Sequence, residues 1–71
     1  MVDMERDFIE YLSGEVKIVR HRELGLVMFL RKENADSIQR ALTTTGYKIS
    51  GKKKKLQGSY YYSLEEDTGG N

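Results

Sequence analysis

Hydrophobic positions near the start of the chain recur with the period of a helix. The large apolar side chains of this segment are spaced as one helical stripe: Met4, Phe8, Tyr11 and Leu12. Asp3 precedes the stripe as a favourable N-cap, and Gly14 follows it as the residue type that commonly ends a helix. The pattern therefore predicts a first helix over residues 4–13.

The pattern then changes to the alternation and β-branching that are typical of strands. Residues 16–21 contain Val16, Ile18 and Val19, and residues 26–32 begin with an unbroken apolar run. The link between these two segments is short. We therefore expect them to pair as an antiparallel hairpin.

A second helix and a second hairpin complete the pattern. Asn34 is a favourable N-cap for a helix over residues 35–45. Residues 47–55 follow as a strand in which Gly51 is a candidate bulge, and residues 59–64 form the last strand.

This order of elements predicts an α+β fold. We expect a two-layer sandwich in which two helices cover one face of a four-stranded antiparallel sheet, in the order αββαββ. Residues 1–64 would form one domain, because 71 residues are too few for two. Residues 65–71 are acidic and glycine-rich without a large apolar side chain, so we expect a disordered C-terminal tail.

The composition argues against an enzyme. The chain has no cysteine and one histidine, His21. It therefore offers no thiolate nucleophile or thiolate metal site, and one candidate base for all its serines. We expect no catalytic site, no metal and no cofactor.

The same composition favours the cytoplasm. No apolar run approaches the ~20 residues that a membrane-spanning helix needs. The acidic start of the chain differs from the basic start of a secretory signal. A lack of cysteine also fits a reducing compartment.

The charged residues are strongly segregated along the chain, although the net charge is only +1. Residues 1–15 carry a net −4 and residues 65–71 a net −3, whereas residues 16–64 hold eleven Lys or Arg against three Asp or Glu, a net +8. The last hairpin is the most basic part. Alternation predicts that one face of its first strand carries Lys48, Ser50, Lys52 and Lys54, with Tyr61 of the facing strand beside them.

A row of lysines beside an exposed ring suits nucleic acid. The amines would neutralise phosphates and the ring would stack on an unpaired base. The candidate contact residues are Lys48, Lys52, Lys53, Lys54, Lys55 and Tyr61, with Arg20, Arg22, Arg31 and Lys32 as a second group. The leading hypothesis is a small, non-enzymatic nucleic-acid-binding protein with a regulatory or accessory role. The competing interpretation is that the lysines protect an edge strand from pairing with other chains.

An apolar sheet face supports a second hypothesis. Val19, Val27 and Phe29 are expected to point away from the helices, together with Tyr61. An exposed patch of this kind often marks a protein interface, and a self-complementary patch would give a two-fold homodimer. The chain would then be a protein-binding module, such as an inhibitor or a small regulatory subunit. Tyr60 and Tyr62 are expected to pack under the helices.

Overall fold

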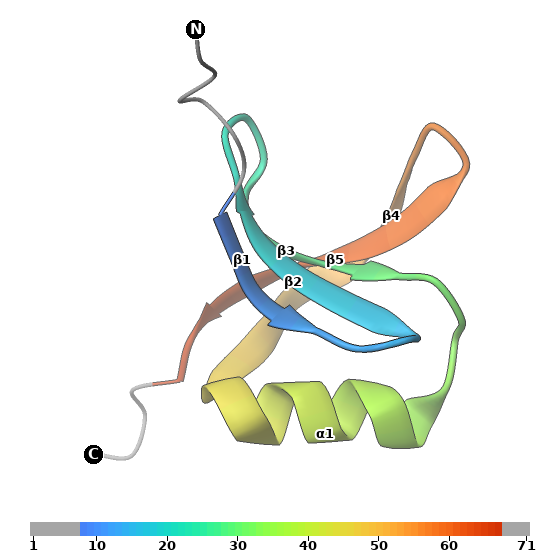
Figure 1. Ribbon diagram of the computed structural model, residues 1–71. Helices are drawn as coiled ribbons and strands as arrows, with labels where there is room; N and C mark the ends of the chain where they lie inside the picture. Colours follow the sequence, from blue (N-terminus) through green and yellow to red (C-terminus); the bar gives the residue numbers. More distant parts are fainter. Residues whose placement is uncertain (1–7, 68–71) are drawn as a thin grey trace, which may run out of the picture.

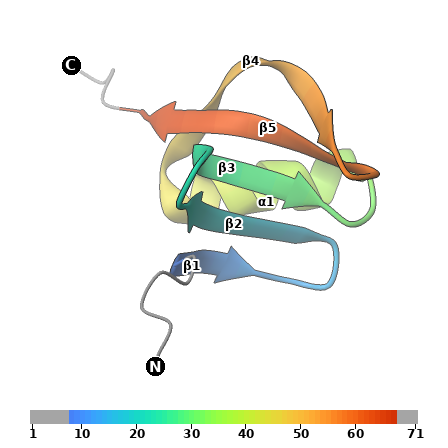
Figure 2. The same cartoon turned by 90° about the horizontal axis from the view of Figure 1, so that it is seen from above.

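Five strands and one helix follow one another along residues 8–67, the part of the chain that this computed structural model describes (Figure 1). In chain order they are β1 Phe8–Leu12, β2 Val16–His21, β3 Gly25–Leu30, α1 Ala35–Thr45, β4 Tyr47–Leu56 and β5 Ser59–Glu66. The strands form one antiparallel sheet in the order β1-β2-β3-β5-β4 (Figure 2). The fold is α+β, but the prediction of four strands and two helices in the order αββαββ is wrong.

The first predicted helix is replaced by β1, because a β-bulge imitates the helical period. β1 pairs with β2, and the register shifts between Ile9 and Tyr11. The extra residue leaves Phe8 and Tyr11 on one face of the strand and Ile9 and Leu12 on the other. Apolar side chains then recur three residues apart, a spacing that also occurs along a helix. Residues 4–7 of the predicted helix lie outside the described residues.

The other predicted elements are confirmed in place and type. β2 and β3 form the antiparallel hairpin. At the start of α1 the Asn34 side chain accepts two backbone N–H hydrogen bonds, as an N-cap should. Gly51 has a φ of 93° and lies between Ser50 and Lys54, where the pairing of β4 with β5 is irregular. β5 continues to Glu66, so the first two residues of the expected tail pair with β4.

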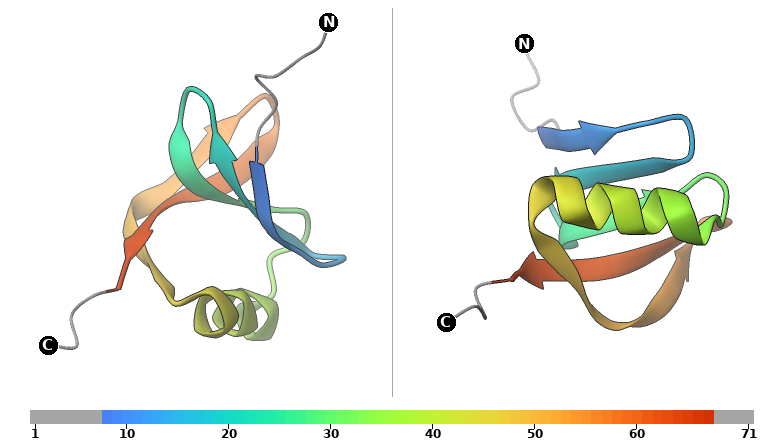
Figure 3. Two further views of the ribbon diagram at one scale, coloured as in Figure 1. Left: turned by 60° about the vertical axis from the view of Figure 1, so that its left-hand side comes forward. Right: turned by 90° about the horizontal axis from the view of Figure 1, so that it is seen from below.

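The main core lies between the sheet and α1, which crosses the middle of the sheet when seen from below (Figure 3). Its buried side chains come from β2, β3, α1 and β5: Val16, Ile18, Met28, Leu30, Ala41 and Leu64. Full burial of an aliphatic side chain of this size contributes about 1.5–3 kcal/mol. From α1, Ile38 and Leu42 pack against this cluster beside the buried Ala41.

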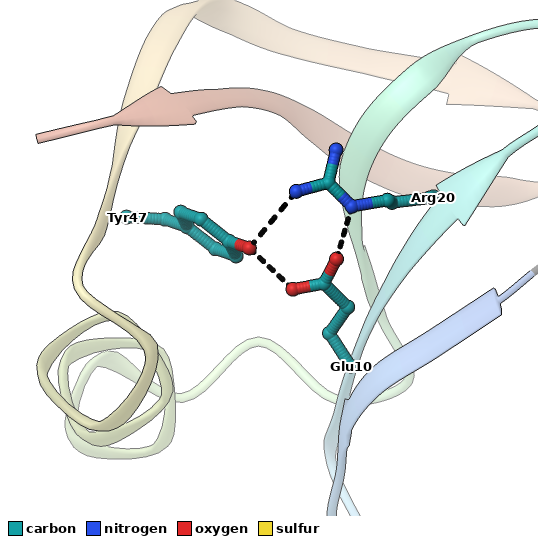
Figure 4. A network of polar contacts seen from close by, with 3 residues as sticks. All are labelled: Glu10, Arg20 and Tyr47. Atoms are coloured by element: carbon teal, nitrogen blue, oxygen red, sulfur yellow. Dashed lines mark hydrogen bonds and ion pairs between the residues drawn. The ribbon is translucent and has the colours of Figure 1, made fainter.

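A polar cluster ties together strands from the two opposite edges of the sheet (Figure 4). Glu10 of β1 accepts a hydrogen bond from the Tyr47 hydroxyl at the start of β4 and forms an ion pair with Arg20 of β2. An Arg20 guanidinium N–H also donates to the Tyr47 oxygen at 3.3 Å. The hydrogen bond to Glu10 raises the pKa of Tyr47 above its ordinary value, because ionisation would place two negative charges side by side.

The sheet is strongly curved. Its two ends, which carry the β2–β3 turn and the β4–β5 turn, rise on the side away from α1 (Figure 1). The β4–β5 turn consists of Gln57 and Gly58, whose φ angles of 50° and 86° are both positive. Such a two-residue turn matches the twist of paired strands. The face away from α1 is thereby made concave.

Candidate functional site

A second, smaller cluster forms the floor of the concave face. Val19, Val27 and Tyr61 are buried there, with exposures of 2%, 0% and 8%, and Phe29 packs against them half-buried. The expectation that Val19, Val27 and Tyr61 are exposed on this face is therefore wrong. Curvature of the sheet covers them, so Phe29 alone of the four still presents its ring to solvent.

A groove of about 870 Å³ lies on this face. The aliphatic side chains of Ile9 and Leu12 line it from β1, and Leu56 lines it beside the β4–β5 turn. Ile9 and Leu12 are 48% and 60% exposed. Phe29 also lines the groove, and its ring contacts that of Tyr61 with centroids 5.5 Å apart. The groove therefore has an apolar lining that is open to solvent.

Cations lie beside this apolar lining. Lys17 is directly opposite Phe29 in the register of β2 and β3, and Arg31 follows two residues after Phe29. Both line the groove, and no residue that lines it is acidic. Neither Lys17 nor Arg31 has an ion pair among the described residues. The groove is thus positively charged without a neutralising carboxylate in its walls.

Two carboxylates with a described polar partner lie on the helix side of the sheet. Glu10 is bound to Arg20 and Tyr47, and Glu15 accepts a hydrogen bond from Ser37 of α1. The groove itself carries the cations Lys17 and Arg31 without an acidic residue in its lining, although the net charge of the chain is +1.

The lysines of β4 do not form one row. Lys48 and Lys54 share the concave side, because they pair with Glu65 and Tyr61. Lys53 and Lys55 instead approach the ring of Tyr60 on the helix side. Lys53 and Lys55 flank Lys54 in the chain, so alternation places them on the face opposite Lys54. The predicted shared face of Lys48 and Lys54 agrees with the pairing of β4 with β5.

The five lysines also differ in their partners. Lys48 forms a 3.7 Å ion pair with Glu65, both half-exposed, which contributes little in water. Lys53 binds the Glu33 carboxylate at 2.8 Å, and this hydrogen bond raises the pKa of Lys53 above its ordinary value. No ion pair within residues 8–67 involves Lys52, Lys54 or Lys55.

Tyr60 is exposed, contrary to the expectation that it packs under the helices. It is 42% exposed next to the β4–β5 turn and is not among the side chains that pack against the main core. The ammonium groups of Lys53 and Lys55 lie 4.8 Å and 5.5 Å from its ring centroid. These are cation–π distances. Tyr62, one pair further along β5, does pack against the main core as expected.

The second basic group is dispersed. Arg20 is held by Glu10 and Tyr47 on the helix side, whereas Arg31 borders the groove. Arg22 and Lys32 are exposed, each in the turn or loop after its strand. Of this group, Arg31 lines the groove, whereas Arg20 is bound in the polar cluster with Glu10 and Tyr47.

His21 is part of the β2–β3 turn. Its Nδ1 accepts the backbone N–H groups of Glu23 and Leu24 at 3.0 Å and 3.1 Å. The imidazole therefore stabilises the turn, and its ring lies 6.3 Å from that of Phe29.

The sequence prediction missed one cation and two aliphatic side chains of the groove. Lys17 was absent from the candidates, because a lone lysine in a β-branched strand carries no signal of its own. Its register opposite Phe29 could have indicated it, once the hairpin was assigned. Ile9 and Leu12 were hidden by the assignment of their segment to a helix.

Comparisons of the chain with protein-family models, with characterised proteins and with solved structures find no match. Within residues 8–67 no helix is long and apolar enough to cross a membrane. The same residues contain no group of three or more histidine or acidic side chains placed to hold a metal ion.

Proposed function

We propose that this protein is a small, non-enzymatic nucleic-acid-binding protein with a regulatory or accessory role. The observation that carries the proposal is the groove of the concave face. It holds Lys17 and Arg31 next to the half-exposed ring of Phe29, with no carboxylate in its lining.

Each part of this arrangement has a physical use in binding nucleic acid. The cations would neutralise phosphates and release their condensed counterions. This release favours binding, and the affinity falls as the salt concentration rises. Lys54 shares the concave side and extends the basic surface along β4. Lysine and arginine contacts to phosphate position a strand without reading its sequence, so weak sequence specificity is expected.

A protein-binding module is the second candidate, and one observation favours it. Ile9, Leu12 and Leu56 around the groove are 48%, 60% and 37% exposed, which is unusual for aliphatic side chains clustered on one surface. A partner protein would bury them. Lys17 and Arg31 beside them have no ion pair within residues 8–67, which favours an anionic partner such as nucleic acid.

The test is fluorescence anisotropy of labelled DNA and RNA, titrated with the protein from about 50 to about 200 mM salt, where phosphate contacts have a large effect. We expect log K to fall linearly with log salt. The Arg31→Gln variant should reduce the slope by about 0.7–0.9, the share of one phosphate contact.

The matched control is Arg40→Gln, which removes an equally exposed arginine from α1 on the other side of the sheet. This variant should leave both affinity and slope close to those of the parent protein. An absence of binding at the lowest salt would refute the proposal. The lysines of β4 would then be explained as protection of an edge strand.

A further inference from the structure

We infer that the ligand is a single strand of nucleic acid, with unpaired bases placed against Phe29 in the groove and against Tyr60 at its rim. The inference rests on the proposed function and specifies its substrate class. It is carried by the apolar and aromatic side chains of the groove, whereas the proposed function is carried by the cations.

The lining of the groove is unsuited to a duplex. A duplex presents phosphates on its outside and keeps the faces of its bases stacked within, so it would leave exposed aliphatic walls without apolar contacts. Ile9, Leu12 and Leu56 supply such walls. A single strand can turn its bases toward them while its phosphates meet Lys17 and Arg31.

Phe29 is built as a stacking platform. Its ring is tilted against those of Tyr61 and His21, with centroids 5.5 Å and 6.3 Å away. It remains half-exposed toward the groove. A ring that is already fixed loses little conformational freedom when a base stacks on it. Lys17 across the strand pair lies where the phosphate of that nucleotide could be bound.

Tyr60 offers a second ring at the end of the groove. It lines the groove and is opposite Leu30 in the register, one position along from the pair formed by Phe29 and Tyr61. The ammonium groups of Lys53 and Lys55 lie over its ring, and Glu33 binds Lys53, so a base that stacks on Tyr60 would displace at least one lysine toward its phosphate. Neighbouring residues of β5 point to opposite faces of the sheet. A nucleic-acid strand in contact with both Phe29 and Tyr60 would therefore pass from the groove around the end of the sheet.

The test compares a labelled single strand of about 12 nucleotides, within the range of known single-strand sites, with a hairpin duplex of the same sequence. DNA and RNA forms of both are titrated with the full chain by anisotropy at one salt concentration. We expect the single strand to bind at least about 10-fold more tightly than the duplex, as a loss of one or two stacked bases implies.

Ring-retaining variants provide the matched controls. Phe29→Leu and Tyr60→Leu should each weaken single-strand binding by about 5-fold to 100-fold, because each removes the stacking of one base. Phe29→Tyr and Tyr60→Phe keep the aromatic face and should bind like the parent protein. Circular dichroism checks the fold of each variant, and the exposed position of Tyr60 keeps its result interpretable even if Phe29→Leu is unstable.

The outcomes separate the two claims. Duplex binding as tight as single-strand binding, or leucine variants that bind like the parent, would overturn the inference and leave the proposed function in place. Failure of both ligands to bind at low salt would overturn both. In that case a protein that buries the apolar groove becomes the better hypothesis.

Discussion

Two neighbouring tyrosines in β5 should respond very differently to removal of the ring. Tyr61 is 8% exposed and lies among Val19, Val27 and Phe29, whereas Tyr60 is 42% exposed at the end of the sheet. Truncation of a buried aromatic side chain to alanine costs about 3–5 kcal/mol. For a chain of 71 residues the whole free energy of unfolding is about 4–11 kcal/mol. Tyr61→Ala should therefore remove a large share of the stability of the protein.

Tyr60→Ala should cost about 1 kcal/mol, because it removes a half-exposed ring and two cation–π contacts that water screens. Urea denaturation followed by circular dichroism measures both variants. With a slope of about 1 kcal/mol per molar urea, the midpoint should fall by about 1 M for Tyr60→Ala and by about 3 M or more for Tyr61→Ala. Tyr61→Phe retains the ring and should stay close to the parent midpoint.

An equal loss for the two alanine variants, or a larger loss for Tyr60→Ala, would refute this reasoning. It would mean that β5 pairs with a register one residue away, since a slip of one residue exchanges the two faces of a strand. The comparison therefore tests the assignment of both faces of the sheet, on which the proposed groove depends.

Three further substitutions test local features of the fold. Asn34→Ala removes the side chain that caps α1 and should lower the free energy of unfolding by about 1 kcal/mol in urea titrations, whereas an unchanged midpoint would contradict the cap. Gln57→Asn places a residue that favours positive φ in the β4–β5 turn, and we expect a gain of about 0.5–1 kcal/mol, visible as a higher melting temperature. Tyr47→Phe tests the raised pKa of Tyr47, which means that the folded state holds this proton more tightly than the unfolded state. The associated stability is present below pH ~10, the ordinary tyrosine pKa, and is lost as the pH rises through the raised value, so the parent should lose more stability than Tyr47→Phe in alkaline denaturation series.

Local sequence signals were sufficient wherever one period dominated. β-branching and alternation in residues 16–21 and the apolar run that begins residues 26–32 predicted the β2–β3 hairpin, and the Asn34 cap predicted α1. In each case the side chains that specify the element also face the core, so local preference and tertiary packing agree.

The same signals failed where a bulge interrupted the alternation. In β1 the extra residue around Glu10 gives apolar side chains a spacing of three, and a sequence pattern cannot distinguish this from a helix. In β4 the irregular stretch between Ser50 and Lys54 adds two residues, so the predicted shared face of Lys48 and Lys54 survives it. Bulges depend on the partner strand, which a local pattern does not contain.

From the sequence one could conclude that the chain is α+β, that its basic residues gather in residues 16–64, and that two hairpins and a helix over residues 35–45 exist. These properties follow from composition and from contacts between residues close in the chain. Tertiary structure alone decided which side chains are exposed. It buried Tyr61, Val19 and Val27 on a curved sheet, turned Tyr60 outward and brought Lys17 beside Phe29. Curvature, strand order and register arise from pairing between distant segments, and for that reason the groove could be located only in the folded chain.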